Sequence, residues 1–254
     1  MPAWTPYTRV ACDAQAEVCL QSLSVLRRSP TADYVATIVQ STFLTPTIKS
    51  VRLRLDRDEF QFLPGQSVWP RFEREGRKFS KIYSIASSPS QCREIELCIS
   101  RVGWSSAYVQ DLAIGQTLPL RGPYGLMTLS ELPVRPRLYI AEGSGIAPLK
   151  SQIDWLLESG FSHPIWLVQT NPETSDQLPY AAYWQHLSQQ CSSFHYRSAT
   201  SQGLEWTIAS LGLNLADMDV EICAVNDRPS QIQTAVMAMG ARAEQVRAEK
   251  FYAF

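Results

Sequence analysis

The stretch of sequence with the clearest chemical potential is RLYIAEGSGIAPLKSQIDWLLESG, residues 137–160. It begins as an apolar strand pattern, passes through a turn that contains Gly143 and Gly145, and continues with apolar residues at helical spacing. Glycines let an anionic ligand approach the backbone N–H groups of a turn, and a following helix adds its positive N-terminal end. Pro148 suits a first helical position, and Gly160 suits the residue after a last helical turn. This pattern predicts a strand, turn and helix that could hold a pyrophosphate.

The cysteine and histidine residues do not predict a metal site. The chain of 254 residues has six cysteines, scattered without a C-x-x-C spacing, and three histidines that are far apart. We therefore expect reduced thiols, no bound metal and no iron–sulfur cluster in this polypeptide.

The overall composition is typical of a globular protein that neither binds nucleic acid nor spans a bilayer. The formal net charge is −1, from 23 basic and 24 acidic residues, so no nucleic-acid partner is expected. No apolar run reaches the roughly 20 residues that span a bilayer, so we expect no membrane span. The N-terminal segment MPAWTPYTRVACDAQAE lacks the basic start and apolar core of a secretory signal, which favours a cytoplasmic location.

The elements that would position the glycine turn divide into two halves, with a boundary expected near residues 132–135. Residues 1–32 form an N-terminal extension in which only residues 18–26 suggest a short helix. Residues 33–132 show short alternating segments between turns, which predict a closed antiparallel β-barrel interrupted by one helix. The expected strands are residues 34–39, 51–55, 66–72, 79–86, 95–102 and 117–121, the helix is residues 105–112, and turns fall at residues 64–65, 73–78 and 122–125.

Residues 133–254 alternate between strand and helix patterns, which predicts an α/β doubly wound parallel sheet with helices on both faces. The expected strands are residues 138–141, 165–169, 194–197, 220–225 and 246–251. Helices are expected after Pro148, near residues 180–189, near residues 204–211, and around the apolar face Ile232, Ala235, Val236 and Met239, closed by Gly240.

Four short motifs follow one another in an order that resembles the ferredoxin–NADP reductase superfamily. They are KIYSIASSP at 81–89, GWSSAYV at 103–109, GSGIAP at 143–148, and Cys223 followed by EKF at 249–251. The resemblance covers about residues 34–254, and the ending EKFYAF is most similar to the reductase components of bacterial oxygenases, here without a fused ferredoxin domain.

The resemblance implies a two-domain architecture and a route for electrons. Residues 33–132 would be an antiparallel Greek-key β-barrel that binds FAD, and residues 133–254 an α/β domain that binds NADH or NADPH. Hydride would pass between the two cofactors at the domain interface. Because no cluster motif occurs in the chain, a one-electron acceptor would be a separate redox protein, a ferredoxin or an oxygenase component.

The resemblance also implies roles for individual residues. Tyr83 would lie along the flavin and Ser84 near its N5 atom, while Cys223 would lie beside the nicotinamide and Phe251 would cover the flavin ring, a task open also to Tyr252 or Phe254. An ordinary strand and a buried core cysteine are the alternatives for Tyr83, Ser84 and Cys223. The implied catalytic residues are Ser84, Cys223 and Phe251. The implied cofactor-binding residues are Lys81, Tyr83, Ser84, Ile99, Ser100, Gly103, Trp104, Ser105, Ser106, Gly143, Ser144, Gly145, Ile146, Ala147, Pro148 and Cys223.

Several positions depart from the family pattern. Lys81 stands where the family has arginine, so a planar phosphate fork becomes a point charge. Glu142 replaces a glycine of the nucleotide turn, either as an anion near the pyrophosphate or as a solvated loop carboxylate. Ala224 and Val225 replace Gly-Pro after the cysteine. Ala199 stands where NADP-specific members tend to carry arginine, which favours NADH.

Three functions are compatible with these residues. The first is a reductase that passes electrons from NAD(P)H through bound FAD to a separate protein acceptor. The second is a flavin or ferric reductase for which flavin is a diffusible substrate, an alternative that Lys81 favours. The third is a non-catalytic flavin- or nucleotide-binding regulatory subunit, which would account for Glu142, Ala224 and Val225 together.

Overall fold

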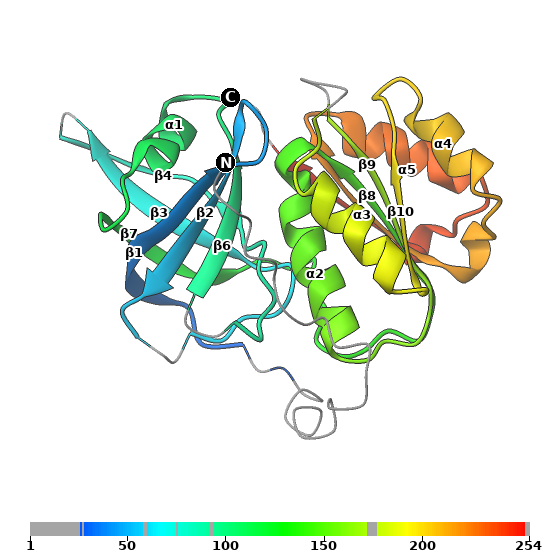
Figure 1. The fold of residues 1–254 in the computed structure, drawn as a ribbon, viewed down its shortest axis with the longest axis horizontal. Coiled ribbons are helices and arrows are strands. Elements are labelled where there is room, and N and C mark those ends of the chain that lie inside the picture. The colour runs from blue at the N-terminus through cyan, green and yellow to red at the C-terminus, as the bar shows by residue number, and fades with distance from the viewer. Residues whose placement is uncertain are drawn as a thin grey trace.

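The computed structural model describes residues 26, 28–57, 60–74, 76–91, 94–171 and 177–251. Two sheets lie side by side, an antiparallel one formed by the first half of the chain and a parallel one formed by the second (Figure 1). The short helix expected at residues 18–26 lies outside the described residues except for Leu26, as do Tyr252 and Phe254.

The first sheet has the strand order β4-β3-β7-β1-β2-β6, with β5 paired to β3, and every pairing is antiparallel. Strand β7 returns after a long connection to lie between β1 and β3, a non-sequential order of the Greek-key kind. The elements are β1 (Ala32–Phe43), β2 (Ile48–Leu55), β3 (Ser67–Arg74), β4 (Arg77–Ser80), β5 (Tyr83–Ser84), β6 (Glu94–Ser100), α1 (Trp104–Asp111) and β7 (Thr117–Tyr124).

The sheet is barrel-like but is not closed by a strand ladder, so the expected closed barrel is wrong in this respect. Among the residues that the structure describes, its two edges meet where Ile85 bridges to Leu97 and where the Ala86 N–H donates to the Glu96 carbonyl oxygen at 2.7 Å. The expected strand 79–86 is divided into β4 and the two-residue β5, because its middle makes no ladder pairing.

Strand β7 extends further than its alternating pattern indicated. A turn was expected at residues 122–125, but the strand continues through Gly122 and Pro123 to Tyr124, which pairs with Ser67 of β3. The turn begins only at Gly125, whose φ of 117° is in the region that favours glycine.

The second sheet is parallel throughout, with the strand order β10-β9-β8-β11-β12. The chain runs from β8 outward to β10 and then returns to the other side of β8, so the strand order reverses between β8 and β11. Ligands of doubly wound sheets bind outside the carboxyl ends of the strands at such a point. The elements are β8 (Arg137–Glu142), η2 (Gly143–Gly145), α2 (Ile146–Glu158), β9 (Ile165–Thr170), α3 (Ala181–Gln190), β10 (Phe194–Ser198), α4 (Leu204–Ser210), η3 (Leu215–Asp217), β11 (Asp219–Val225), α5 (Arg228–Ala238), η4 (Ala243–Gln245) and β12 (Val246–Phe251).

Side chains of β8 alternate between two hydrophobic cores. Tyr139 and Ala141 pack with α2 and α3, whereas Leu138 and Ile140 pack with α4 and α5. The two pairs of helices cover opposite faces of the sheet in Figure 1. The prediction of a doubly wound sheet is therefore confirmed, although α2 begins at Ile146, two residues before Pro148.

Strand β6 is likewise buried on both faces, which joins the two sheets. Ile95, Leu97 and Ile99 point into the core of the first sheet. Cys98, on the opposite face of the strand, belongs to the core that includes α2 and β8. This second face brings the two halves of the molecule into direct contact.

Candidate functional site

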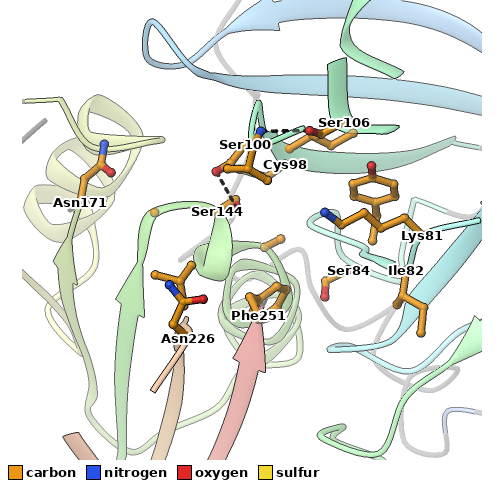
Figure 2. A pocket seen from close by; sticks show the side chains of 16 residues that line it. Lys81, Ile82, Ser84, Cys98, Ser100, Ser106, Ser144, Asn171, Asn226 and Phe251 are labelled. Carbon is orange, nitrogen blue, oxygen red and sulfur yellow. Dashed lines mark hydrogen bonds between the residues drawn. The ribbon is translucent and has the colours of Figure 1, made fainter. Parts of the chain in front are cut away.

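A cavity of about 270 Å³ lies where β5 and β6 of the first sheet meet the carboxyl ends of β8, β11 and β12. Figure 2 shows side chains from both sheets pointing into it. The lining residues are Lys81, Ile82, Tyr83, Ser84, Cys98, Ile99, Ser100, Val102, Ser106, Gly143, Ser144, Ala147, Asn171, Val225, Asn226 and Phe251.

The wall formed by β5 presents two hydroxyl groups. Tyr83 is 7% exposed, and its phenol oxygen is buried without a hydrogen-bond partner among the described residues. Burial raises the pKa of Tyr83, so the phenol keeps its proton and remains a donor that lacks an acceptor. Ser84 Oγ lies 3.3 Å from Ser67 Oγ, which holds its side chain in place. A bound oxygen-rich molecule would supply the acceptor that Tyr83 lacks.

Next to this wall, Lys81 brings a positive charge to the cavity. It follows β4, lines the cavity and is half-buried, and burial lowers the pKa of its ammonium. A cation in a partly buried pocket suits a phosphate-containing ligand, although as a point charge rather than as a planar fork.

The hydroxyl of Ser106, which lines the cavity, also holds the local backbone. Ser106 Oγ accepts a hydrogen bond from the Val102 N–H at 3.0 Å and donates one to the Gly103 carbonyl oxygen at 2.9 Å. It therefore organises the turn before α1. Trp104 and Ser105, in the first turn of that helix, do not line the cavity.

The glycine turn forms the opposite wall. Gly143 has a φ of 55°, and Ser144 accepts a hydrogen bond from Ser100 Oγ of β6 at 2.9 Å. A Cβ atom on Gly145 would lie 2.5 Å from the Cys223 carbonyl oxygen, so the turn is in close contact with β11. The turn is thus fixed to both sheets.

The structure brings most of the predicted site residues together, with Cys223 as the main exception. Cys223 was expected at the carboxyl end of its strand, but β11 continues to Val225, which pairs with Phe251. Cys223 is 0% exposed and does not line the cavity, where Val225 and Asn226 take its place. The predicted residues that line the cavity are Lys81, Tyr83, Ser84, Ile99, Ser100, Ser106, Gly143, Ser144, Ala147 and Phe251, and those that do not are Gly103, Trp104, Ser105, Gly145, Ile146, Pro148 and Cys223.

Sequence reasoning missed six residues of the lining: Ile82, Cys98, Val102, Asn171, Val225 and Asn226. For Cys98 a signal existed, because strand alternation places it on the same face as Ser100, which was predicted. For Asn171, at the end of β9, only its place at the carboxyl edge of the sheet could have pointed to the site.

Glu142 lies in a second cavity, of about 560 Å³, beside the first. It is 1% exposed, so the interpretation as a solvated loop carboxylate is wrong. Its Oε2 atom accepts a long hydrogen bond of 3.4 Å from the Val225 N–H, and its Oε1 atom lies 3.9 Å from Arg228 Nε. Burial raises the pKa of Glu142. The cavity is lined by Glu142, Ser201, Gln202, Glu205, Val225, Asn226 and Arg228.

Among the residues that the structure describes, no group of three or more histidine, cysteine, aspartate or glutamate side chains could hold a metal ion. No helix in the described ranges is long and apolar enough to cross a membrane.

Comparison with known proteins agrees with this architecture. Residues 35–129 match the family model of the oxidoreductase FAD-binding domain. The phenol hydroxylase P5 protein of Acinetobacter pittii is 40% identical over 141 residues, which are 54% of this chain and 39% of that protein. Reductase component 1 of terephthalate 1,2-dioxygenase from a Comamonas species is 29% identical over 259 residues, covering 94% of this chain and 75% of the relative. The chain spans less than half the length of the phenol hydroxylase relative.

Among solved structures, the flavohem-like FAD/NAD-binding domain of nitric oxide dioxygenase from Vibrio cholerae superposes with a TM-score of 0.76. It is 18% identical, and the match covers 86% of this chain and 98% of that chain. The two therefore share the arrangement of an antiparallel and a parallel sheet.

A barrel-like sheet beside a doubly wound parallel sheet, with a cavity where they meet, is the architecture that this chain shares with that FAD/NAD-binding domain. The unpartnered Tyr83 phenol, the Lys81 ammonium and the glycine turn suit a ligand rich in phosphate oxygens, and the family match over residues 35–129 supports FAD as that ligand. The chain is thus similar to FAD-binding oxidoreductases over residues 35–129, and it shares its two-sheet fold with the flavohem-like FAD/NAD-binding domain.

Proposed function

We propose that this chain is an NAD(P)H-dependent, FAD-containing reductase that passes electrons to a separate redox protein, a ferredoxin or an oxygenase component. The observation that carries the proposal is the cavity between the two sheets, which is lined both by the buried, unpartnered Tyr83 phenol and by the glycine turn. The names of the relatives, which include reductase components of oxygenases, support an acceptor of this kind. We propose residues 33–132 and 133–254 as the two functional domains.

Each wall of the cavity has a separate task. Bound FAD supplies the chemistry, because it accepts two electrons together and releases them one at a time. Tyr83 would donate a hydrogen bond to it, and Ser84, held by Ser67, would present a hydroxyl proton at the same wall. Phe251, at the end of β12, covers the cavity from the nucleotide side. The hydrogen bond from Ser100 to Ser144 holds the glycine turn against β6.

The colour of the purified protein tests this function. We expect about one FAD per chain, bleached by NADH without air and reoxidised by a one-electron acceptor protein. A colourless protein that oxidises NADH only with added flavin would instead show a flavin reductase. A protein that turns over under neither condition would be a regulatory subunit.

We propose that NADH is preferred over NADPH. Two carboxylates, those of Glu142 and Glu205, lie 3.9 Å and 3.5 Å from the guanidinium of Arg228 in the second cavity. A carboxylate accepts hydrogen bonds from ribose hydroxyls but repels a phosphate dianion. The Arg228 guanidinium offsets one of the two carboxylates, and Ala199, after β10, adds no second positive charge.

The substitution Glu142→Gln should lower the KM and Kd for both nucleotides and should narrow the preference for NADH. Two unit charges roughly 6 Å apart repel by about 3 kcal/mol at an effective dielectric constant near 20, and solvent screening reduces this. We therefore expect a gain of at most about tenfold for NADH. The exposed Glu244→Gln is the matched control. Unchanged Kd values in Glu142→Gln would show that this carboxylate does not face the nucleotide.

The substitution Tyr83→Phe should weaken FAD binding by about 1 kcal/mol, the usual size of one hydrogen bond, without destabilising the apoprotein. The reason is that the phenol has no partner until a ligand supplies one. Tyr139→Phe is the matched control, because its buried hydroxyl donates to Gln152 at 3.1 Å and its loss should destabilise the apoprotein instead. FAD titration and thermal unfolding measure both effects. Equal FAD affinity in Tyr83→Phe and wild type would remove Tyr83 from the site.

A further inference from the structure

A buried ion cluster joins the two sheets beside the cavity. Helix α2 carries Lys150 and Asp154 one turn apart, and Lys150 Nζ lies 2.7 Å from Asp154 Oδ2. The same ammonium lies 3.7 Å from Glu96 Oε2 on β6 and donates to the Ala86 carbonyl oxygen at 3.4 Å. All three charged side chains are buried. We name Glu96, Lys150 and Asp154 the inter-sheet cluster.

Two tyrosines contact the inter-sheet cluster. Tyr180 donates to Glu96 Oε1 and Tyr183 donates to Asp154 Oδ1, each at 2.7 Å. Both rings lie with their centroids 5.3 Å from Lys150 Nζ, a distance at which a cation is attracted to an aromatic face. Although burial opposes a charge on Lys150, Asp154 and Glu96 raise the pKa of its ammonium, which stays charged. Buried charges are tolerated when they are paired and hydrogen-bonded in this way.

The backbone of Tyr180 shows that this arrangement is held against a local cost. Its φ is 63°, in the left-handed region that a tyrosine rarely adopts. Such a conformation persists only where the surrounding structure determines it, and it points to a functional constraint. Here it places the phenol of the residue before α3 on the carboxylate of Glu96.

The inter-sheet cluster and the cavity share one face of β6. Glu96, Cys98 and Ser100 alternate along the strand, so they point the same way. Cys98 and Ser100 line the cavity, and Ser100 donates to Ser144 in the turn that leads into α2. Helix α2 lies on the side of the parallel sheet that faces β6 (Figure 1). It is thus attached to this strand at two places, through Ser144 in the turn that precedes the helix and through Lys150 in the helix itself.

We propose that Lys150 is a positioning residue of the reductase. Its ion pair with Glu96 holds α2 against β6. The glycine turn before α2 is thereby kept at the distance from the β5 wall that electron transfer between the two cofactors requires. This inference rests on the proposed function. Transfer between bound groups needs reacting atoms about 3–3.5 Å apart, and a misplacement of about 1 Å can cost roughly a hundredfold in rate. Neither FAD nor the nucleotide needs to touch Lys150 for this effect.

The test compares Lys150→Met, Lys150→Arg and wild type in three measurements. They are the FAD content by absorbance, the Kd of NAD⁺ by fluorescence titration, and the limiting rate at which saturating NADH reduces bound FAD in anaerobic stopped flow. For Lys150→Met we expect FAD content and Kd within about twofold of wild type, and a limiting rate lower by at least about tenfold. Lys150→Arg should recover most of the rate, because it restores the cation.

Controls separate positioning from general damage. Arg242 lies before the start of β12, where it pairs with Glu244 and donates to Gln245 and to the Ala216 carbonyl oxygen. Because the cavity lies at the other end of β12, Arg242→Met should leave all three measurements unchanged. An unchanged limiting rate in Lys150→Met would overturn the inference, and so would losses of FAD or NAD⁺ affinity as large as the loss of rate. If Lys150→Met does not fold, Tyr180→Phe removes one hydrogen bond to Glu96 and should lower the rate by about threefold, and an unchanged rate there would count against the inference.

A further readout distinguishes this inference from the proposed function. Hydrogen exchange should be faster in β6 and α2 of Lys150→Met than in wild type, with β1 unchanged. Wild-type protein whose FAD is not reduced by NADH would overturn the proposed function itself. Equal exchange in β6 and α2 of both proteins would overturn the attachment of α2 through Lys150.

Discussion

Gly145→Ala should abolish most nucleotide binding and lower the free energy of unfolding by about 2 kcal/mol. The added Cβ atom would lie 2.5 Å from the Cys223 carbonyl oxygen and 2.9 Å from the Cys223 carbonyl carbon. Both are backbone atoms of a central strand, so they cannot rotate away. The glycine turn must then move from β11 and from the cavity wall, and we expect the Kd for NADH to rise at least roughly tenfold.

Gly203→Ala is the matched control for this substitution. Its Cβ atom would meet Thr200 Oγ1 at 2.9 Å, but that is the end of a side chain that can rotate. Gly203 also has an ordinary φ of −98°. Calorimetry and nucleotide titration on both variants make the comparison. Wild-type stability and affinity in Gly145→Ala would mean that the turn can separate from β11 without cost.

Arg137→Met should lower the free energy of unfolding by about 3 kcal/mol, the largest effect on stability that we expect from a single substitution. Arg137 is 3% exposed, lies 3.0 Å from Asp219 and pairs with the buried Glu221. Its removal leaves the Glu221 carboxylate in the interior with Arg247 as its remaining cation. The loss of one partner from a buried pair is costly, because a charge stays behind with less compensation.

Arg135 offers a control that shares the same carboxylate. It lies 3.4 Å from Asp219 but is 46% exposed, so Arg135→Met should cost less than about 1 kcal/mol. Urea unfolding of the two variants measures the difference. Equal losses in both would show that burial of Arg137 does not determine the strength of its ion pairs.

The order of helices and strands could be predicted because it depends on local patterns. The final strand, residues 246–251, was predicted with the bounds that the structure shows. Helix α2 ends at Glu158, close to Gly160, whose φ of 72° suits a residue after a helix. The motif order led to most of the cavity lining, because the motifs fall on the segments of the two sheets that meet at the cavity.

The features that could not be predicted correctly from the sequence depend on contacts between segments that are distant in the chain. Glu142 is buried because β11 and the start of α5 cover it, and nothing in its own neighbourhood in the sequence indicates this. Cys223 lies inside its strand because Val225 pairs with Phe251, a pairing set by the final strand. The inter-sheet cluster could not be predicted either, since its members come from β6, α2 and the residues before and within α3.

The two-sided burial of β6 limits how the two halves can be recombined. A protein built from independent modules would allow its flavin-binding half to be exchanged for that of a relative. Here Glu96 and Cys98 face residues of the half that contains the parallel sheet, including Lys150 and Tyr180. A chimaera that replaced one half alone would leave Glu96 or Lys150 without its partner at the contact between the two halves. In evolution and in engineering, the two halves must therefore change together along this strand.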